Sequence, residues 1–259
     1  MSCKVIMITS CKGGVGKSTI AANLGYTLAS DGANTLLIDL DLGNRCLDLI
    51  LGLESRALYD VRDVAMSGIP LESAEVSFPG NEKFHFLPAP YGNAEITEDA
   101  FSFLISKAKS IYDYIIIDTP GDIGIPFSLA CLVSDISIIA ATHGPTAIRA
   151  AGYTAQEIEK KGIEDVRLII NGYDVYDKKS LSKGARASVI DIIDQTNVKL
   201  LGVVPYSAAL SRAQERGELV YTLPRGNERR AFRNITDRLE GKSVILFDGF
   251  KKISRRKIM

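Results

Sequence analysis

Short apolar runs alternate with amphipathic helical patterns along the whole chain. The apolar runs predict strands near residues 4–10, 34–40, 84–88, 113–118, 135–141, 166–171 and 199–204. The helical patterns fall near residues 17–30, 97–110, 146–160, 181–194, 207–214 and 227–239. Runs such as "YIIID" are apolar at every position, which is typical of parallel strands buried on both faces. The alternation predicts an α/β fold with a mostly parallel, twisted sheet and helices on both faces.

The last part of the chain differs from the rest. No Pro-, Gly- or Ser-rich linker interrupts residues 1–240, which are expected to form one domain, whereas residues 241–259 are strongly basic. If this tail were helical, its apolar residues would share one arc and most basic residues would lie opposite. That apolar arc would contain Leu246, Phe247, Phe250, Ile253 and Ile258. We therefore expect a short amphipathic helix on an anionic membrane surface. A frayed terminus, or a strand packed on the body, is the alternative.

The composition limits where in the cell the protein is expected and which partners it is expected to bind. The 259 residues carry a formal net charge of +0, so no overall basic field draws the chain onto nucleic acid. The four cysteines form no C-x-x-C pair, which argues against an internal metal site and against a disulfide framework. The apolar runs are too short to span a bilayer, and the start of the chain does not read as a signal peptide. We expect a cytoplasmic protein, with the inner face of the cell membrane as a second, peripheral location.

The stretch "SCKGGVGKST", residues 10–19, carries the first candidate chemistry. It follows a predicted strand and opens a predicted helix, which is the setting of a phosphate-binding loop in P-loop NTPases. Gly13, Gly14 and Gly16 let backbone N–H groups surround phosphate oxygens without side-chain clashes. Lys17 is expected to reach the β- and γ-phosphates, and Ser18 to ligate Mg²⁺. The usual opening glycine is replaced by Cys11 and is followed by an additional lysine, Lys12.

Three carboxylates follow other predicted strands. "LLIDLDLG" places Asp39 and Asp41 at the end of the second strand, and "YIIIDTPGD" places Asp118 at the end of another. Ligands of parallel α/β sheets bind at the carboxyl ends of the strands, so the three are expected near the glycine loop. Asp118 is expected to support Mg²⁺ through water.

The segments "KGGVGKST" at 12–19, "DLDLGNRCLDLILG" at 39–52 and "IIIDTPGD" at 115–122 resemble the deviant-Walker-A ATPases of the MinD/ParA family. The second segment is most similar to the MinD group of septum-site-determining ATPases. The resemblance covers roughly residues 4–240 and implies ATP hydrolysis with Mg²⁺, and ADP as product. It also implies a homodimer when ATP is bound, in which Lys12 reaches the phosphates held by the other subunit.

The resemblance further implies roles for individual residues. Val15 would belong to the phosphate loop, and Thr19 would touch the α-phosphate. Asp41 would position the attacking water, and Asp39 would support Mg²⁺ together with Asp118. The positions that would contact adenine are Asn171, in "LIINGYD", and Pro205. A regulatory or cargo protein of unknown identity is the implied partner, and the cycle would position it at the division site or in a similar spatial task.

The sequence also departs from that pattern. Asn44 and Cys46 replace residues common in the MinD group, and Ala150 replaces an acidic residue in a helix that the family uses for partner contacts. The sequence leaves open three other functions within the superfamily: that of a DNA-partition ATPase, a flagellar-placement relative, or a metallocluster or nickel carrier. The first would use the arginines of residues 212–238 on DNA phosphates. Interleaved acidic residues and zero net charge make DNA binding the less favoured reading.

Overall fold

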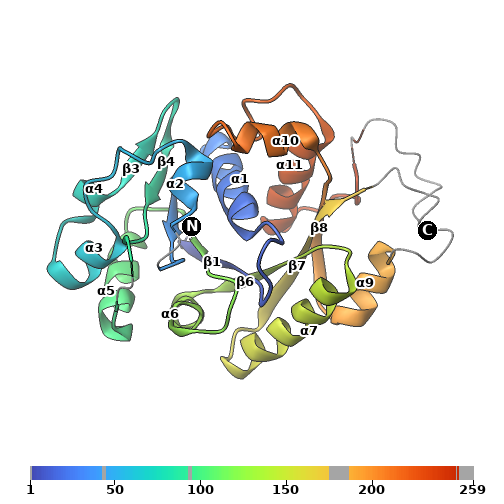
Figure 1. Cartoon of the computed structure of the whole chain (residues 1–259), viewed down its shortest axis with the longest axis horizontal. Coiled ribbons are helices and arrows are strands. Elements are labelled where there is room, and N and C mark those ends of the chain that lie inside the picture. Colours follow the sequence, from blue (N-terminus) through green and yellow to red (C-terminus); the bar gives the residue numbers. More distant parts are fainter. Residues whose placement is uncertain (1, 43–44, 93–94, 175–186, 249, 251–259) are drawn as a thin grey trace.

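The computed structural model of the chain describes residues 2–42, 45–92, 95–174, 187–248 and 250. One eight-stranded sheet runs through it in the order β3-β4-β2-β5-β1-β6-β7-β8 (Figure 1). Neighbouring strands are parallel except β3 and β4, which are antiparallel. The strands are β1 (Lys4–Thr9), β2 (Thr35–Asp39), β3 (Val76–Phe78), β4 (Asn81–Leu87), β5 (Tyr114–Asp118), β6 (Ile136–Ala141), β7 (Asp165–Tyr173) and β8 (Lys199–Pro205).

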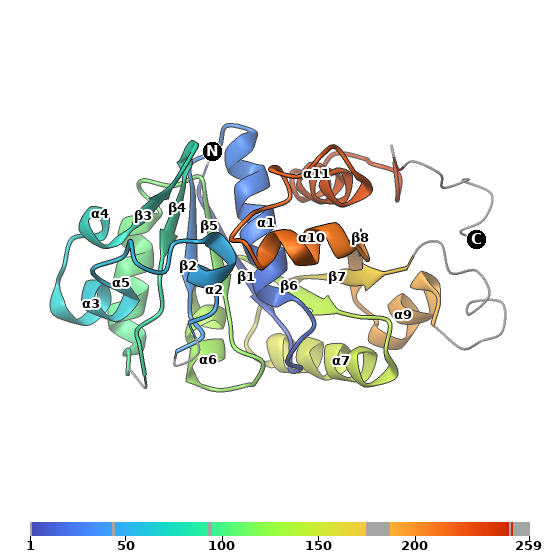
Figure 2. The ribbon, with the colours of Figure 1, turned by 45° about the horizontal axis from the view of Figure 1, so that its top comes forward.

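Helices cover both faces of this sheet (Figure 2). One face carries α1 (Lys17–Ser30), α2 (Leu47–Leu51), α10 (Ala208–Gln214) and α11 (Asn227–Leu239), whose apolar residues pack in one core cluster. The other face carries α3 (Val61–Ser67), α4 (Leu71–Ala74), α5 (Glu98–Ala108), α6 (Ile125–Val133), α7 (Pro145–Lys160) and α9 (Val189–Thr196). Every residue of β2, β5 and β6 is buried, as expected for strands covered on both sides. The predicted α/β fold is confirmed.

Several elements were not predicted. The short helices α2, α3 and α4 and the three-residue strand β3 leave too little pattern to recognise. Helix α6 reads "IPFSLACLV" and is apolar on most sides, so it shows no clear helical period. The predicted helix over 181–194 begins later: Ser188 caps α9 through its hydroxyl, which accepts a hydrogen bond from the N–H of Asp191. Residues 181–186 lie outside the described residues.

The beginning of the tail packs on the body of the protein. Leu246 and Phe247 contact the core, and Phe250 is only 9% exposed. The Arg238 guanidinium donates to the carbonyl of Val244 from Nε at 2.9 Å and from Nη2 at 2.7 Å. Carbonyl oxygens that a helix would use internally are thus occupied by α11 side chains.

The expected amphipathic helix is therefore wrong for the described part of the tail, where residues 242–245 have no regular secondary structure and 246–248 form a turn. The alternative of a segment packed on the body of the protein is closer to what the structure shows, although the segment is not a strand. Residues 251–259 lie outside the described residues.

Candidate nucleotide site

The glycine loop connects β1 to α1 at the carboxyl edge of the sheet. Gly14 and Gly16 have φ angles of 74° and 90°, a left-handed conformation that disfavours any side chain. Because Gly16 is the N-cap of α1, no side chain caps the first N–H groups of that helix. Uncapped N–H groups and the helix dipole together favour a negatively charged group at this position. The loop therefore has the backbone geometry of a phosphate site.

Two other strand ends lie directly against the loop. The Asn171 side chain, from β7, donates from Nδ2 to the carbonyl of Val15 at 2.9 Å. A Cβ at Gly16 would lie 2.1 Å from that Nδ2, so the amide fits only against glycine. After β5, a Cβ at Gly121 would lie 3.2 Å from the backbone N of Gly13. Gly121 belongs to the segment "IIIDTPGD", but its contact with the loop is visible only in three dimensions.

The predicted carboxylates Asp39 and Asp118 are paired neighbours across β2 and β5 and are almost completely buried. Burial raises the pKa of Asp39 to about 7, against the effect of hydrogen bonds from the N–H groups of Asp41 and Leu47. Burial and the negative charge of Asp39 raise the pKa of Asp118 well above its usual range. A hydrogen bond with the Ser18 hydroxyl and the charge of Lys17 act in the opposite direction.

These two acids and Ser18 fit a magnesium ion. Asp118 Oδ1 is buried and finds no hydrogen-bond partner among the described residues. A divalent cation would satisfy this oxygen and relieve the repulsion between the two carboxylates. Within the described ranges, no group of three or more His, Cys, Asp or Glu residues could hold a metal by itself. Mg²⁺ usually takes one or two carboxylates and completes its shell with waters and phosphate oxygens.

The segment that carries Asp41 is fixed by hydrogen bonds to Asp39. The Asp41 N–H donates to Asp39 Oδ1 at 2.9 Å, and the Leu47 N–H donates to Asp39 Oδ2 at 3.3 Å. One buried carboxylate therefore holds both the residue after β2 and the start of α2. Of the two loop lysines, Lys17 is buried beside the acids and Lys12 is half-exposed.

The remaining predicted positions lie at the same edge of the sheet. Ser18 and Thr19 are in the first turn of α1, and Pro205 ends β8 opposite Tyr173 of β7. The Tyr206 N–H donates to the Tyr173 carbonyl at 3.0 Å, which fixes the backbone just after Pro205. The structure thus brings Asn171 to the loop itself, while its expected contact with adenine stays a prediction.

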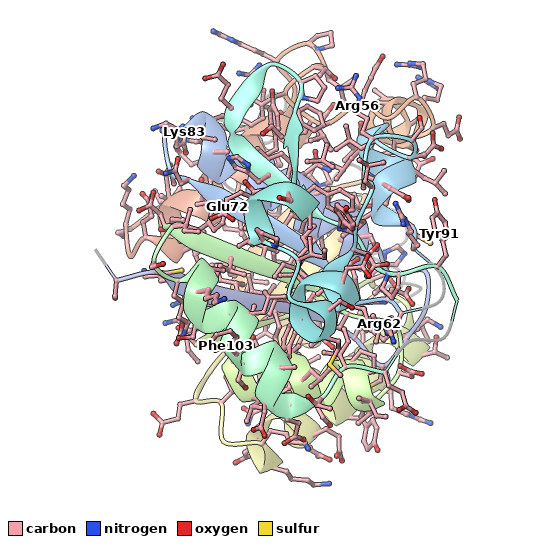
Figure 3. The ribbon with its side chains drawn as sticks, turned by 90° about the vertical axis from the view of Figure 1, so that its left-hand side faces the viewer. Arg56, Arg62, Glu72, Lys83, Tyr91 and Phe103 are labelled. Atoms are coloured by element: carbon pink, nitrogen blue, oxygen red, sulfur yellow. The ribbon has the colours of Figure 1, made fainter. Side chains whose placement is uncertain are left out.

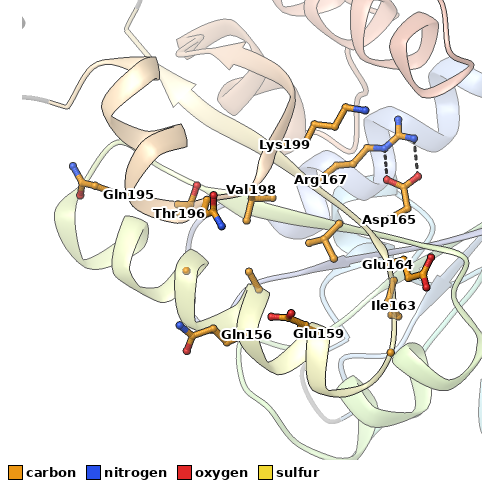
Figure 4. A pocket seen from close by; sticks show the side chains of 15 residues that line it. Gln156, Glu159, Ile163, Glu164, Asp165, Arg167, Gln195, Thr196, Val198 and Lys199 are labelled. Carbon is orange, nitrogen blue, oxygen red and sulfur yellow. Dashed lines mark hydrogen bonds and ion pairs between the residues drawn. The ribbon is translucent and has the colours of Figure 1, made fainter.

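A cavity of about 1140 Å³ lies at the opposite end of the strands (Figure 4). It is open to solvent and is lined by the C-terminal halves of α7 and α9 and by the beginnings of β7 and β8. Its charged lining includes Arg167 and Asp165, which pair through two hydrogen bonds of 2.7 Å (Figure 4). Ligands of such sheets bind at the carboxyl ends of the strands, so this cavity is not the candidate nucleotide site.

Comparison with known proteins identifies the family of the chain. The family described as "CobQ/CobB/MinD/ParA nucleotide binding domain" matches residues 6–220, which contain the glycine loop and all three carboxylates. The chain belongs to this family. The expected nucleotide-binding P-loop ATPase is confirmed.

Relatives with about one third identical residues are named as MinD proteins. The chain is 33% identical over 248 residues to the putative septum site-determining protein MinD of Guillardia theta, covering 95% of this chain and 91% of that protein. It is 32% identical over 247 residues to septum site-determining protein MinD of Bacillus subtilis, covering 94% and 91%. The expected resemblance to MinD is therefore confirmed.

Solved structures show the same fold. The Aquifex aeolicus MinC:MinD cell division protein complex matches with a TM-score of 0.85 and 33% identity, covering 94% of this chain and 98% of that chain. The Pyrococcus horikoshii septum site-determining protein MinD complexed with Mg-ADP matches with a TM-score of 0.80 and 24% identity, covering 92% and 96%.

Proposed function

We propose that this protein is a MinD-like ATPase in which ATP binding drives formation of a homodimer and hydrolysis reverses it. The cycle positions a partner protein in division-site placement or a similar spatial task. The observation that carries this proposal is the buried pair Asp39 and Asp118 with the unsatisfied Oδ1 of Asp118, next to a glycine loop that begins with Lys12. The relatives named for septum-site determination support the biological setting.

Each residue of the site has a distinct task in this cycle. Mg²⁺-ATP supplies the transferable phosphoryl group and the cation that neutralises part of its charge. The backbone of the glycine loop binds the phosphates, and Lys17 adds a positive charge from within the same subunit. Asp39 fixes the backbone N–H of Asp41, so the Asp41 carboxylate can orient a water molecule toward the phosphate. Asn171 holds the loop through the carbonyl of Val15.

Lys12 makes the reaction depend on dimerisation. It is half-exposed and lies at the start of the loop, whereas Lys17 is buried. A lysine that acts on the phosphates of the partner subunit would neutralise charge only when two ATP-bound subunits face each other. Dimerisation is then a consequence of ATP binding and a condition for hydrolysis.

The partner is proposed to be a regulatory protein that recognises the dimer. The similar Aquifex aeolicus structure is a complex of MinD with MinC, which supports a partner of that class. Among the described residues, every helix is too short or too polar to cross a bilayer. A peripheral location at the inner face of the membrane is proposed to depend on the basic end of the chain, residues 241–259.

Contacts of the arginines disfavour the alternative of DNA partition. Five of the arginines that could have formed a phosphate-binding surface interact with other groups of the protein. Arg216 pairs with Glu218, Arg230 with Asp248 and Arg233 with Asp31, Arg229 stacks on Tyr221, and Arg238 donates to backbone carbonyls. These guanidinium groups would have to leave their partners to bind DNA.

The test is the oligomeric state, measured by light scattering with Mg-ATP and with Mg-ADP. The Asp41→Ala variant is expected to bind ATP without hydrolysing it and to form a dimer only with Mg-ATP. Adding Lys12→Ala is expected to abolish that dimer while leaving binding of a fluorescent ATP analogue within about twofold. A monomer in every nucleotide state would refute the dimerisation switch, and a dimer that persists without Lys12 would refute its role across the interface.

A further inference from the structure

Arg45 lies at the centre of a cluster beside the catalytic segment. Its guanidinium donates from Nε to Asp48 Oδ2 at 2.6 Å, and its Cζ lies 4.0 Å from the centre of the Tyr91 ring. Arg45 is 7% exposed and Asp48 2% exposed, so this ion pair is buried. Tyr91 comes from the loop after β4 and is 74% exposed. The tyrosine thus covers a buried arginine from the solvent side.

The backbone of Arg45 connects this cluster directly to Asp41. The Arg45 N–H donates to the Asp41 carbonyl at 3.3 Å, and the Asp41 N–H donates to Asp39 Oδ1 at 2.9 Å. Arg45 has a φ of 37°, a left-handed conformation that is unfavourable for a residue with a side chain. Among the described residues, the ion pair with Asp48 and the stacked Tyr91 ring help to hold it there. Asp41 is therefore restrained through its N–H and its carbonyl.

We propose that Tyr91 and Arg45 are positioning residues for ATP hydrolysis, in which the Tyr91 ring holds the Arg45 side chain and thereby fixes Asp41. The proposal rests on the proposed function, since it assumes that Asp41 orients the attacking water. Tyr91 itself touches neither the glycine loop nor the carboxylate pair in any described contact. Its loss should lower the fraction of molecules with Asp41 correctly placed and leave the ATP-binding groups unchanged.

Tyr91 is well suited to a test because it is mostly exposed. Tyr91→Ala removes the stacking, and Tyr91→Phe keeps a ring over the guanidinium. Phe103 on α5 provides a matched control: it is 62% exposed, and Lys107 Nζ lies 4.3 Å from its ring centre. Figure 3 shows Tyr91 and Phe103 well apart on one side of the molecule. Phe103→Ala therefore removes an exposed aromatic ring and a cation–ring contact at a distance from the site.

The expected result is a separation of kcat from KM. Tyr91→Ala should lower kcat about two- to fivefold, the range that corresponds to an exposed cation–ring contact of 0.5–1 kcal/mol. KM for ATP should change less than about twofold, and Tyr91→Phe should restore kcat. Phe103→Ala should match the unmodified protein in kcat, and every variant should unfold within about 4 °C of the unmodified protein. A kcat for Tyr91→Ala that is unchanged or raised overturns the proposal.

Two further measurements separate this idea from its alternatives. If kcat of Tyr91→Ala recovers at high protein concentration, Tyr91 acts across the subunit interface instead, and the proposal is wrong. If the unmodified protein has no ATPase activity, the proposed function is wrong. The contact between Tyr91 and Arg45 is then tested by fluorescence. The chain has no tryptophan, so Tyr91→Trp introduces a single fluorophore over Arg45. Adding Arg45→Gln should shift that emission and increase its quenching by acrylamide; an unchanged spectrum would show that the ring does not stack on Arg45.

Discussion

Gly52 and Gly217 bring two turns into backbone contact, and this contact allows a quantitative test of the fold. Gly52 ends α2 with a φ of 65°, and Gly217 follows α10 with a φ of 67°. A Cβ at position 217 would lie 2.5 Å from the Cα and 2.7 Å from the N of Gly52. Both obstacles are backbone atoms, so no flexible side chain can move out of the way. Gly217→Ala must displace α2 or the turn after α10.

Two costs add up in this variant. An alanine in the left-handed conformation costs about 1 kcal/mol relative to glycine. Overpacking against atoms that cannot rearrange costs a further 1–3 kcal/mol, roughly. We therefore expect Gly217→Ala to lower the free energy of unfolding by about 2–4 kcal/mol. Because α2 follows the segment that carries Asp41, ATP hydrolysis should slow as well.

Gly68→Ala is the matched control. Gly68 ends α3 with a φ of 73°, and nothing lies within 4 Å of a Cβ at that position. It should carry only the conformational cost, about 1 kcal/mol. Urea unfolding followed by circular dichroism measures both variants. Equal losses of stability in Gly217→Ala and Gly68→Ala would refute the backbone contact between α2 and the turn after α10.

Two other predictions concern the tail and a histidine. Deletion of residues 244–259 removes Leu246, Phe247 and Phe250 from their packed positions. It should lower the melting temperature by about 6–12 °C relative to deletion of 251–259, which keeps these three residues. Equal melting temperatures of the two deletions in differential scanning calorimetry would contradict this. A hydrogen bond to Glu75 raises the pKa of His85. The protonated His85 therefore stabilises the folded protein fully below a pH of about 6.5, and this stabilisation is lost as pH rises through the folded-state pKa. His85→Gln should therefore remove about 1 kcal/mol at pH 6 and little at pH 8.5, in urea titrations at both values; a loss independent of pH would show that the charged pair is not responsible.

The sequence was sufficient for the candidate site because the site is made of strand ends. Asp39, Asp118 and the glycine loop each follow an apolar run, and parallel strands place their carboxyl ends at one edge. The order of strands and helices along the chain is therefore enough to predict that these residues lie close together. The contact of Asn171 with Val15 joins residues 156 positions apart and depends on how far β7 extends before its turn. No local pattern encodes that distance.

Contacts made by exposed or irregular segments were beyond such reasoning. Tyr91 looks like an ordinary loop tyrosine, and Arg45 like a solvated charge, until the loop after β4 is placed beside α2. In the tail, a pattern was recognised but was assigned to the wrong surface. Its amphipathic pattern was real, but Leu246, Phe247 and Phe250 are apolar because they cover the protein, and helical periodicity alone does not distinguish a membrane surface from the core.

The packing of Leu246, Phe247 and Phe250 on the body changes what membrane association would require. Three of the apolar residues assigned to a membrane-facing arc contact the body, and Arg230, Asn234 and Arg238 on one face of α11 donate to the segment that carries them. A membrane would have to compete with those contacts, or use only residues 251–259, "KKISRRKIM", in which basic side chains outnumber apolar ones. In the second case the attraction is mainly electrostatic, about 1 kcal/mol for each basic residue near an anionic surface, and it weakens as salt is added. Binding of one subunit would then be weak and reversible, and presentation of two tails by an ATP-bound dimer would raise it without any new contact. The packed segment therefore makes dimerisation, and not the tail alone, the step that would control residence at the membrane.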